Sequence, residues 1–163
     1  MRTLCSLPRL FAAALLALLF CWPAAAGTPV AGAFATGYAK GAWHLPEPPA
    51  IAGDAQGVLY TPAGLPLYTL DAQLTEIVSP CLSCREGDLH GTLDDGIGPG
   101  PDFVVQGHWI VSQFTGQGSF DATIWKPTGP ALTPVGRLIG LVDDPPFPPG
   151  VPGTFSARWA LRR

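Results

Sequence analysis

The chain has 163 residues, with 9 basic and 12 acidic side chains and a formal net charge of −3. Nucleic acid and anionic lipid bind clustered positive surfaces, so neither is expected as a partner of a chain with so few basic residues. The 20 glycines and 19 prolines would suit a disordered chain, but aromatic residues make up 10% of the sequence, and disordered chains lack such apolar content. The composition therefore indicates a folded protein with many turns.

The first 26 residues have the features of a secretory leader. Two arginines supply a basic start, Leu10–Trp22 is an apolar run, and small residues precede a cleavage site after Ala26. The run is shorter than the roughly 20 residues that span a bilayer, so we expect no integral membrane segment after cleavage. Cys21 would suit lipoprotein processing, but Phe20 stands before it, where that processing needs a small residue. We therefore expect an exported protein, periplasmic or extracellular.

The mature part, residues 27–163, has the length of a single domain with one core. Its pattern divides into three segments. Residues 27–80 are rich in loop-forming residues, residues 81–102 are rich in cysteine, aspartate and glycine, and residues 103–163 alternate regularly between apolar and polar positions. The middle segment is predicted to be a long connection that leads into the regular part.

Strands are already indicated in the N-terminal segment. Gly32–Ala39 is a candidate first strand, although its glycines weaken the prediction. Gln56–Thr61 and Leu65–Leu70 flank a Pro-Ala-Gly turn and predict a β-hairpin. Leu74–Val78 follows as a short apolar strand.

Residues 103–163 predict four consecutive strands in an antiparallel meander. In the first of them, Phe103, Val105 and Trp109 share one face, while His108 lies on the other face and is expected to be solvated. No stretch of the mature chain has helical periodicity. The predicted fold is all-β, with about seven to nine short strands, and a small barrel is favoured over a sandwich because closure removes exposed strand edges.

Cys81 and Cys84 are the only cysteines of the mature chain, and their spacing is compatible with three kinds of site. A disulfide is favoured, because the expected compartment is oxidising and the pair has no other partner. A zinc site is the second interpretation, since two thiolates at this spacing can reach one ion and His90 or His108 could complete the shell. Thiol–disulfide exchange is the third, and it lacks the helix that such a site requires.

Carboxylates gather after this cysteine pair, at Asp94, Asp95 and Asp102, on a glycine-rich loop. Carboxylate and carbonyl oxygens on such a loop can bind calcium, although the regular Asp-x-Asp-x-Asp-Gly spacing is absent. The alternative metal site predicted from the sequence thus comprises Cys81, Cys84, His90 and these three aspartates, with calcium or zinc as the ion.

Catalysis has little support in the sequence. The Gly-x-Ser-x-Gly turn of a serine hydrolase does not occur, and Asp88 with His90 indicates only that both side chains share one face. The leading hypothesis is an exported, non-enzymatic β-domain that binds a small ligand or a protein partner, with no cofactor expected. The alternative is a metal-binding protein or metal-dependent enzyme built on the predicted cysteine, histidine and aspartate residues.

Overall fold

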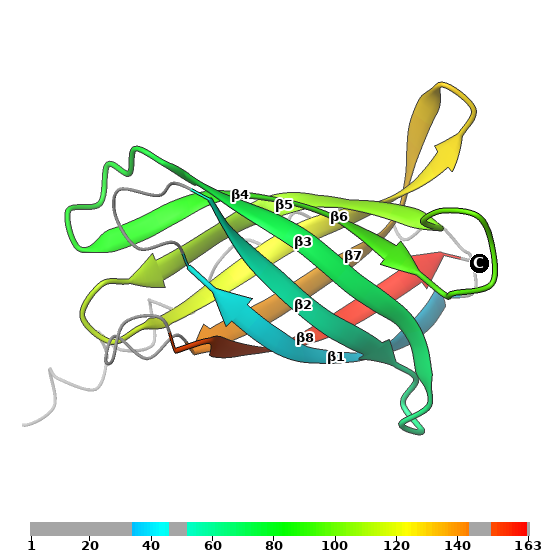
Figure 1. The fold of residues 1–163 in the computed structure, drawn as a ribbon, viewed down its shortest axis with the longest axis horizontal. Coiled ribbons are helices and arrows are strands. Elements are labelled where there is room, and N and C mark those ends of the chain that lie inside the picture. Colours follow the sequence, from blue (N-terminus) through cyan, green and yellow to red (C-terminus); the bar gives the residue numbers. More distant parts are fainter. Residues whose placement is uncertain (1–33, 46–51, 144–150, 163) are drawn as a thin grey trace, which may run out of the picture. The chain divides into compact units, whose positions relative to one another are not determined.

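The computed structural model describes residues 34–45, 52–143 and 151–162, and eight antiparallel strands account for most of them (Figure 1). Each strand is hydrogen-bonded to the next in sequence, and β1 also pairs with β8, which closes the barrel. The strands are β1 (Phe34–His44), β2 (Ala52–Tyr60), β3 (Pro66–Ile77), β4 (Cys84–Asp94), β5 (Phe103–Ser112), β6 (Gln117–Thr128), β7 (Ala131–Asp143) and β8 (Gly153–Arg162).

The predicted all-β class, the strand number and the preference for a barrel are confirmed. The described residues contain no helix that is long and apolar enough to cross a membrane. The predicted leader, residues 1–26, lies outside the part of the chain that the structure describes.

Strict alternation along the strands separates the inside of the barrel from the outside. In β8, Phe155, Ala157, Trp159 and Leu161 are buried and the residues between them are mostly exposed. The same period holds in β5, where Val105, Trp109 and Val111 are buried. The face predicted for β5 is confirmed, and apolar burial on one face supplies the main driving force for the fold.

Rings from opposite walls meet inside the barrel. Trp43 of β1 and Trp109 of β5 lie edge to face with ring centroids 6.1 Å apart, and Trp43 also stacks on Phe120 of β6 at 5.7 Å. Phe120 in turn contacts Phe155 of β8 at 5.7 Å. Because β1 and β5 are four strands apart in an eight-stranded barrel, these contacts fill its full width at this level.

Inward-facing glycines make room for these rings. A Cβ placed on Gly57 would lie 2.6 Å from the Phe155 ring, and one on Gly87 would lie 2.8 Å from the Trp109 ring. Both separations are shorter than van der Waals contact between carbon atoms. Gly57 and Gly87 are therefore small partners of large side chains, in the large-to-small alternation that a narrow barrel needs.

The structure differs from the predicted connection over residues 81–102, because Cys84–Asp94 forms the full-length strand β4. Its inward positions alternate glycine with leucine, as in Gly87 and Leu89, so the apolar period is visible only at every fourth residue. The predicted hairpin is confirmed as β2 and β3, but the separate strand predicted over Leu74–Val78 is the second half of β3, whose last residue is Ile77.

Candidate functional site

The two cysteines lie in the turn between β3 and β4, with their sulfur atoms 2.14 Å apart, the distance of a disulfide. The predicted pairing is thereby confirmed. Ser79 Oγ accepts a hydrogen bond from the Cys81 amide at 3.0 Å, and the Cys84 amide donates to the Cys81 carbonyl at 3.2 Å. Disulfide sulfurs are not the thiolate ligands that zinc requires, so the predicted zinc site loses its two sulfur ligands.

The six residues of the predicted metal site occupy three separate places. Cys84 begins β4 and Asp94 ends it, so an extended strand of 11 residues, about 33 Å long, separates the cysteines from the aspartates. His90 lies between them on the outer face of β4 and is exposed. Only Asp94, Asp95 and Asp102 are brought together.

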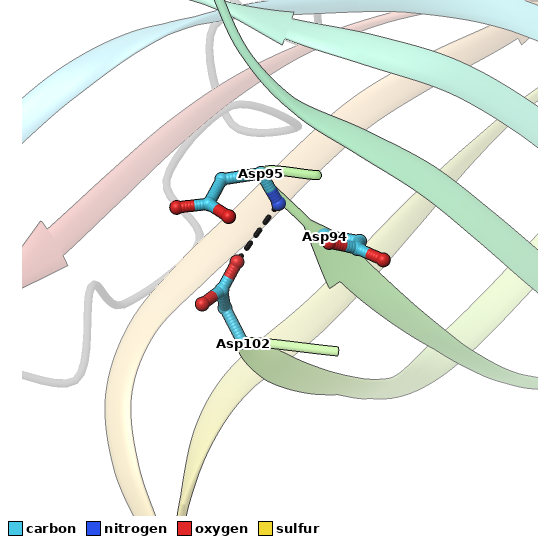
Figure 2. Close-up of side chains that lie close together, drawn as sticks. All are labelled: Asp94, Asp95 and Asp102. Atoms are coloured by element: carbon cyan, nitrogen blue, oxygen red, sulfur yellow. Dashed lines mark hydrogen bonds between the residues drawn. The ribbon is translucent and has the colours of Figure 1, made fainter. Parts of the chain in front are cut away.

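These three aspartates converge at the end of the barrel opposite the disulfide, where β4 turns into β5 (Figure 2). One carboxylate oxygen from each lies within 4.8 Å of those of the others. The loop holds them through its own backbone: Asp102 accepts a hydrogen bond from the Asp95 amide at 2.8 Å, and Asp94 accepts one from the Gly96 amide at 2.7 Å. Each carboxylate keeps a second oxygen, so the trio has the ligand chemistry of a calcium site.

The pKa of Tyr68, near the start of β3, is affected by the charges of this cluster. Its ring packs edge to face against Phe103 with centroids 5.5 Å apart. Burial raises the pKa of the Tyr68 phenol above its usual 10.0, and the negative charges of Asp102 and Asp95 raise it further. The neutral phenol is therefore the form that the fold stabilises.

A second polar group lies on the outer face of β4 and β5. His108 faces two carboxylates, with Nε2 3.6 Å from Glu86 and Nδ1 3.9 Å from Asp88. The predicted solvation of His108 agrees with its exposed side-chain fraction of 48%. Asp88 and His90 share one face, as predicted, and the structure shows that it is the outer one. The histidine opposite Asp88 is His108, because the strand register decides which residues are neighbours.

An ion pair that the sequence analysis missed lies inside the barrel at the disulfide end. Arg85 and Glu76 face inward from adjacent strands, and two guanidinium nitrogens donate to the two carboxylate oxygens at 3.0 and 2.6 Å. The exposed fractions of the two side chains are 21% and 27%. Arg85 is two residues before the inward-facing Gly87, and Glu76 is two residues after the inward-facing Leu74. Strand alternation could therefore have predicted that both side chains face inward.

The outer surface of β7, β8 and β1 is hollowed. A groove of about 710 Å³, here called the β8 groove, is lined by side chains that include Tyr38, Pro62, Arg137, Ile139 and Arg158. A neighbouring hollow of about 550 Å³ continues along β8 past Ser156. Arg137 donates to Asp121 of β6 through Nε at 2.7 Å, and this hydrogen bond raises the pKa of Arg137. Sequence reasoning missed the groove, because its lining comes from three strands and one turn.

Comparison with known proteins gives this chain no relative. No family model, curated protein or solved structure matches it. Function therefore has to be inferred from the geometry of the described residues.

Proposed function

We propose that this protein is an exported, non-enzymatic binding domain that binds its ligand on the outer face of the barrel. The filled interior supports this assignment. Barrels that carry a ligand inside leave a cavity between their walls, whereas here Trp43 and Trp109 meet from opposite strands. A ligand bound at this level would have to displace these rings, so the outer surface is the better binding face.

The β8 groove carries the proposal. Its volume of about 710 Å³ falls in the range of small-ligand sites, roughly 300–1,000 Å³. Its lining combines apolar side chains, such as Ile139 and Pro62, with the polar groups of Arg158 and Tyr38. A few polar groups set in an apolar surface are the usual composition of a site that binds and orients a small molecule.

Export is supported by two independent features. The leader-like residues 1–26 are followed by a mature part whose two cysteines are joined, and disulfides persist in oxidising compartments. A binding role without catalysis agrees with the sequence, in which no nucleophile stands in a recognisable hydrolase motif.

A small-molecule screen by NMR, with hits mapped on isotope-labelled protein, tests this function. The expected hits shift resonances of outward-facing residues on β7, β8 and β1 and are recovered chemically unchanged. Shifts confined to the inward-facing Trp109 and Phe120 would contradict the outer binding face. Conversion of a hit into product would contradict the non-enzymatic role.

Calcium binding is a second candidate, favoured by the approach of Asp94, Asp95 and Asp102 within 4.8 Å. Calcium should raise the melting temperature, because an ion that binds only the folded state stabilises that state. Asp95→Asn should abolish this rise, whereas Asp71→Asn, an exposed aspartate on β3 outside the cluster, should leave it unchanged. Equal melting temperatures in calcium and in chelator would contradict the candidate.

A further inference from the structure

Charge is segregated on the outside of the barrel. On β2, β3, β4 and β5 the only arginine or lysine is Arg85, which faces inward with its partner Glu76, while the other acidic side chains face outward. These are Asp54, Asp71, Glu86, Asp88 and Asp94. On β7, β8 and β1 the pattern reverses: the outward cations are Lys40, Arg137, Arg158 and Arg162, and the single acidic residue is Asp143 at the end of β7. The barrel thus has one acidic and one basic side.

Arg158 lies near the middle of the basic side and in the β8 groove. It is opposite Ile139 of β7 and Tyr38 of β1 in the strand register. Its exposed guanidinium has no hydrogen bond or ion pair with any other described residue, whereas Arg137 is held by Asp121. Arg158 therefore retains its full capacity to bind an anion.

The wall beside Arg158 is flat and aromatic. Tyr38 stacks on Tyr60 with ring centroids 5.1 Å apart and an interplanar angle of 18°. Lys40 lies 5.8 Å from the centre of the Tyr38 ring, which adds a second cation to this wall. Ile139 supplies an apolar surface across the groove, and Ala160, which is opposite Arg137 and two residues after Arg158 on β8, is small. A planar apolar body would fit against these groups.

We infer that the β8 groove binds a small organic anion, with a carboxylate attached to a flat apolar body. Arg158 binds the carboxylate through its planar fork of donors, the geometry that favours two parallel hydrogen bonds. Tyr38 and Ile139 contact the apolar body. This inference rests on the proposed binding function and names its ligand class.

The local charge pattern favours a small anion over a polyanion. Specific binding of nucleic acid depends on many phosphate contacts, and the groove offers one unpaired guanidinium. The acidic strands β2 to β5 adjoin β1 and would repel a long anionic chain that ran around the barrel. A single carboxylate at Arg158 avoids this repulsion.

Naphthalene-2-carboxylate is the probe, and its neutral carboxamide is the matched comparison. NMR titration should show saturable shifts at Tyr38, Ile139 and Ala160, with the carboxylate bound at least about tenfold more tightly than the carboxamide, as a charge-assisted hydrogen bond would produce. Arg158→Gln should weaken carboxylate binding about tenfold or more and leave the melting temperature unchanged, because the side chain is exposed.

Arg162→Gln is the control, because Arg162 also faces outward from β8 but does not line the groove. It should leave carboxylate affinity within about twofold of the wild-type value, since exposed charges a Debye length apart are screened. Equal losses in the two variants would overturn the assignment to Arg158.

Other outcomes separate this inference from the proposed function. Equal affinity for carboxylate and carboxamide in the groove would overturn the anion class while leaving an outer binding face. Shifts confined to Trp109 and Phe120 would overturn both. A titration that shows no saturation by about 10 mM probe would mean affinity weaker than that of a specific site and would overturn the inference. A dimer that Arg158→Gln dissociates would do the same, since the groove would then be covered by a second copy.

Discussion

Trp43 and Trp109 contact each other from opposite walls of the barrel, at 6.1 Å between ring centroids and 81° between ring planes. Trp109 is further fixed because its indole nitrogen donates to the carbonyl oxygen of Asp88 on the neighbouring strand at 3.2 Å. Both side chains are at most 1% exposed. The pair therefore joins β1 and β5, two strands of the closed sheet that share no backbone hydrogen bonds.

Trp109→Ala should lower the free energy of unfolding by about 3–5 kcal/mol, because it opens a cavity at the centre of the core. Urea denaturation followed by circular dichroism measures the change. Phe114→Ala is the control: Phe114 is 79% exposed in the turn after β5, and its removal should change stability by no more than about 0.5 kcal/mol. Similar losses in the two variants would show that the tryptophan contact does not support the fold.

Gly87→Ala should destabilise the protein by about 1–3 kcal/mol or more, because the new methyl group would press on the Trp109 ring and on the backbone of Thr75. Gly98→Ala offers a matched control in the β4–β5 loop, where a Cβ would meet nothing within 4 Å. The control should be neutral or slightly stabilising. Chemical denaturation measures the free energy of unfolding of both variants, and equal values would contradict the role given to Gly87.

Strand alternation explains why most of the fold could be predicted from the sequence. Where inward positions hold large apolar residues, as in β5 and β8, the alternation is plain in the sequence, and the face predicted for β5 agrees with the structure. In β4, glycines occupy alternate inward positions, and one of them, Gly87, makes room for the Trp109 ring of the neighbouring strand. In the sequence alone, a glycine that makes room for a tryptophan of another strand cannot be told from a loop glycine. The segment that forms β4 was therefore predicted to be a connection.

The candidate sites were less predictable because they depend on neighbours across strands. Asp94, Asp95 and Asp102 could be grouped, since one short loop holds all three. The Arg85–Glu76 pair and the β8 groove each combine side chains of different strands. The sequence does not specify which residues lie opposite one another on paired strands. Cys81 and His90 were grouped with the aspartates because they are close in sequence. Residues along one extended strand lie far apart in space, so the structure separates them.

Alkaline pH should destabilise the protein partly through Tyr68. Burial, Asp102 and Asp95 raise its pKa in the folded state above the ordinary 10.0. Its contribution to stability is therefore complete below about pH 10, the unfolded pKa, and is lost as the pH rises through the raised folded value. Tyr68→Phe should reduce the alkaline loss of stability, measured by urea denaturation at a series of pH values.

Asp102→Asn tests the cause of this shift. Removing the nearby negative charge should lower the pKa of Tyr68 toward its usual value, which ultraviolet titration of the phenols can follow. An unchanged alkaline profile in Tyr68→Phe would contradict the linkage.

Removal of the disulfide should cost little stability, because it closes only a four-residue loop. The loop-entropy relation gives about 2 kcal/mol for Cys81→Ser combined with Cys84→Ser. Urea denaturation of the oxidised protein with and without reductant should show the same loss in the wild type and no effect of reductant on the double variant. A chelator should leave the wild-type denaturation midpoint unchanged in calcium-free buffer. If the purified protein instead has two reactive thiols at these positions and loses stability with chelator, the pair binds a metal and the disulfide assignment fails.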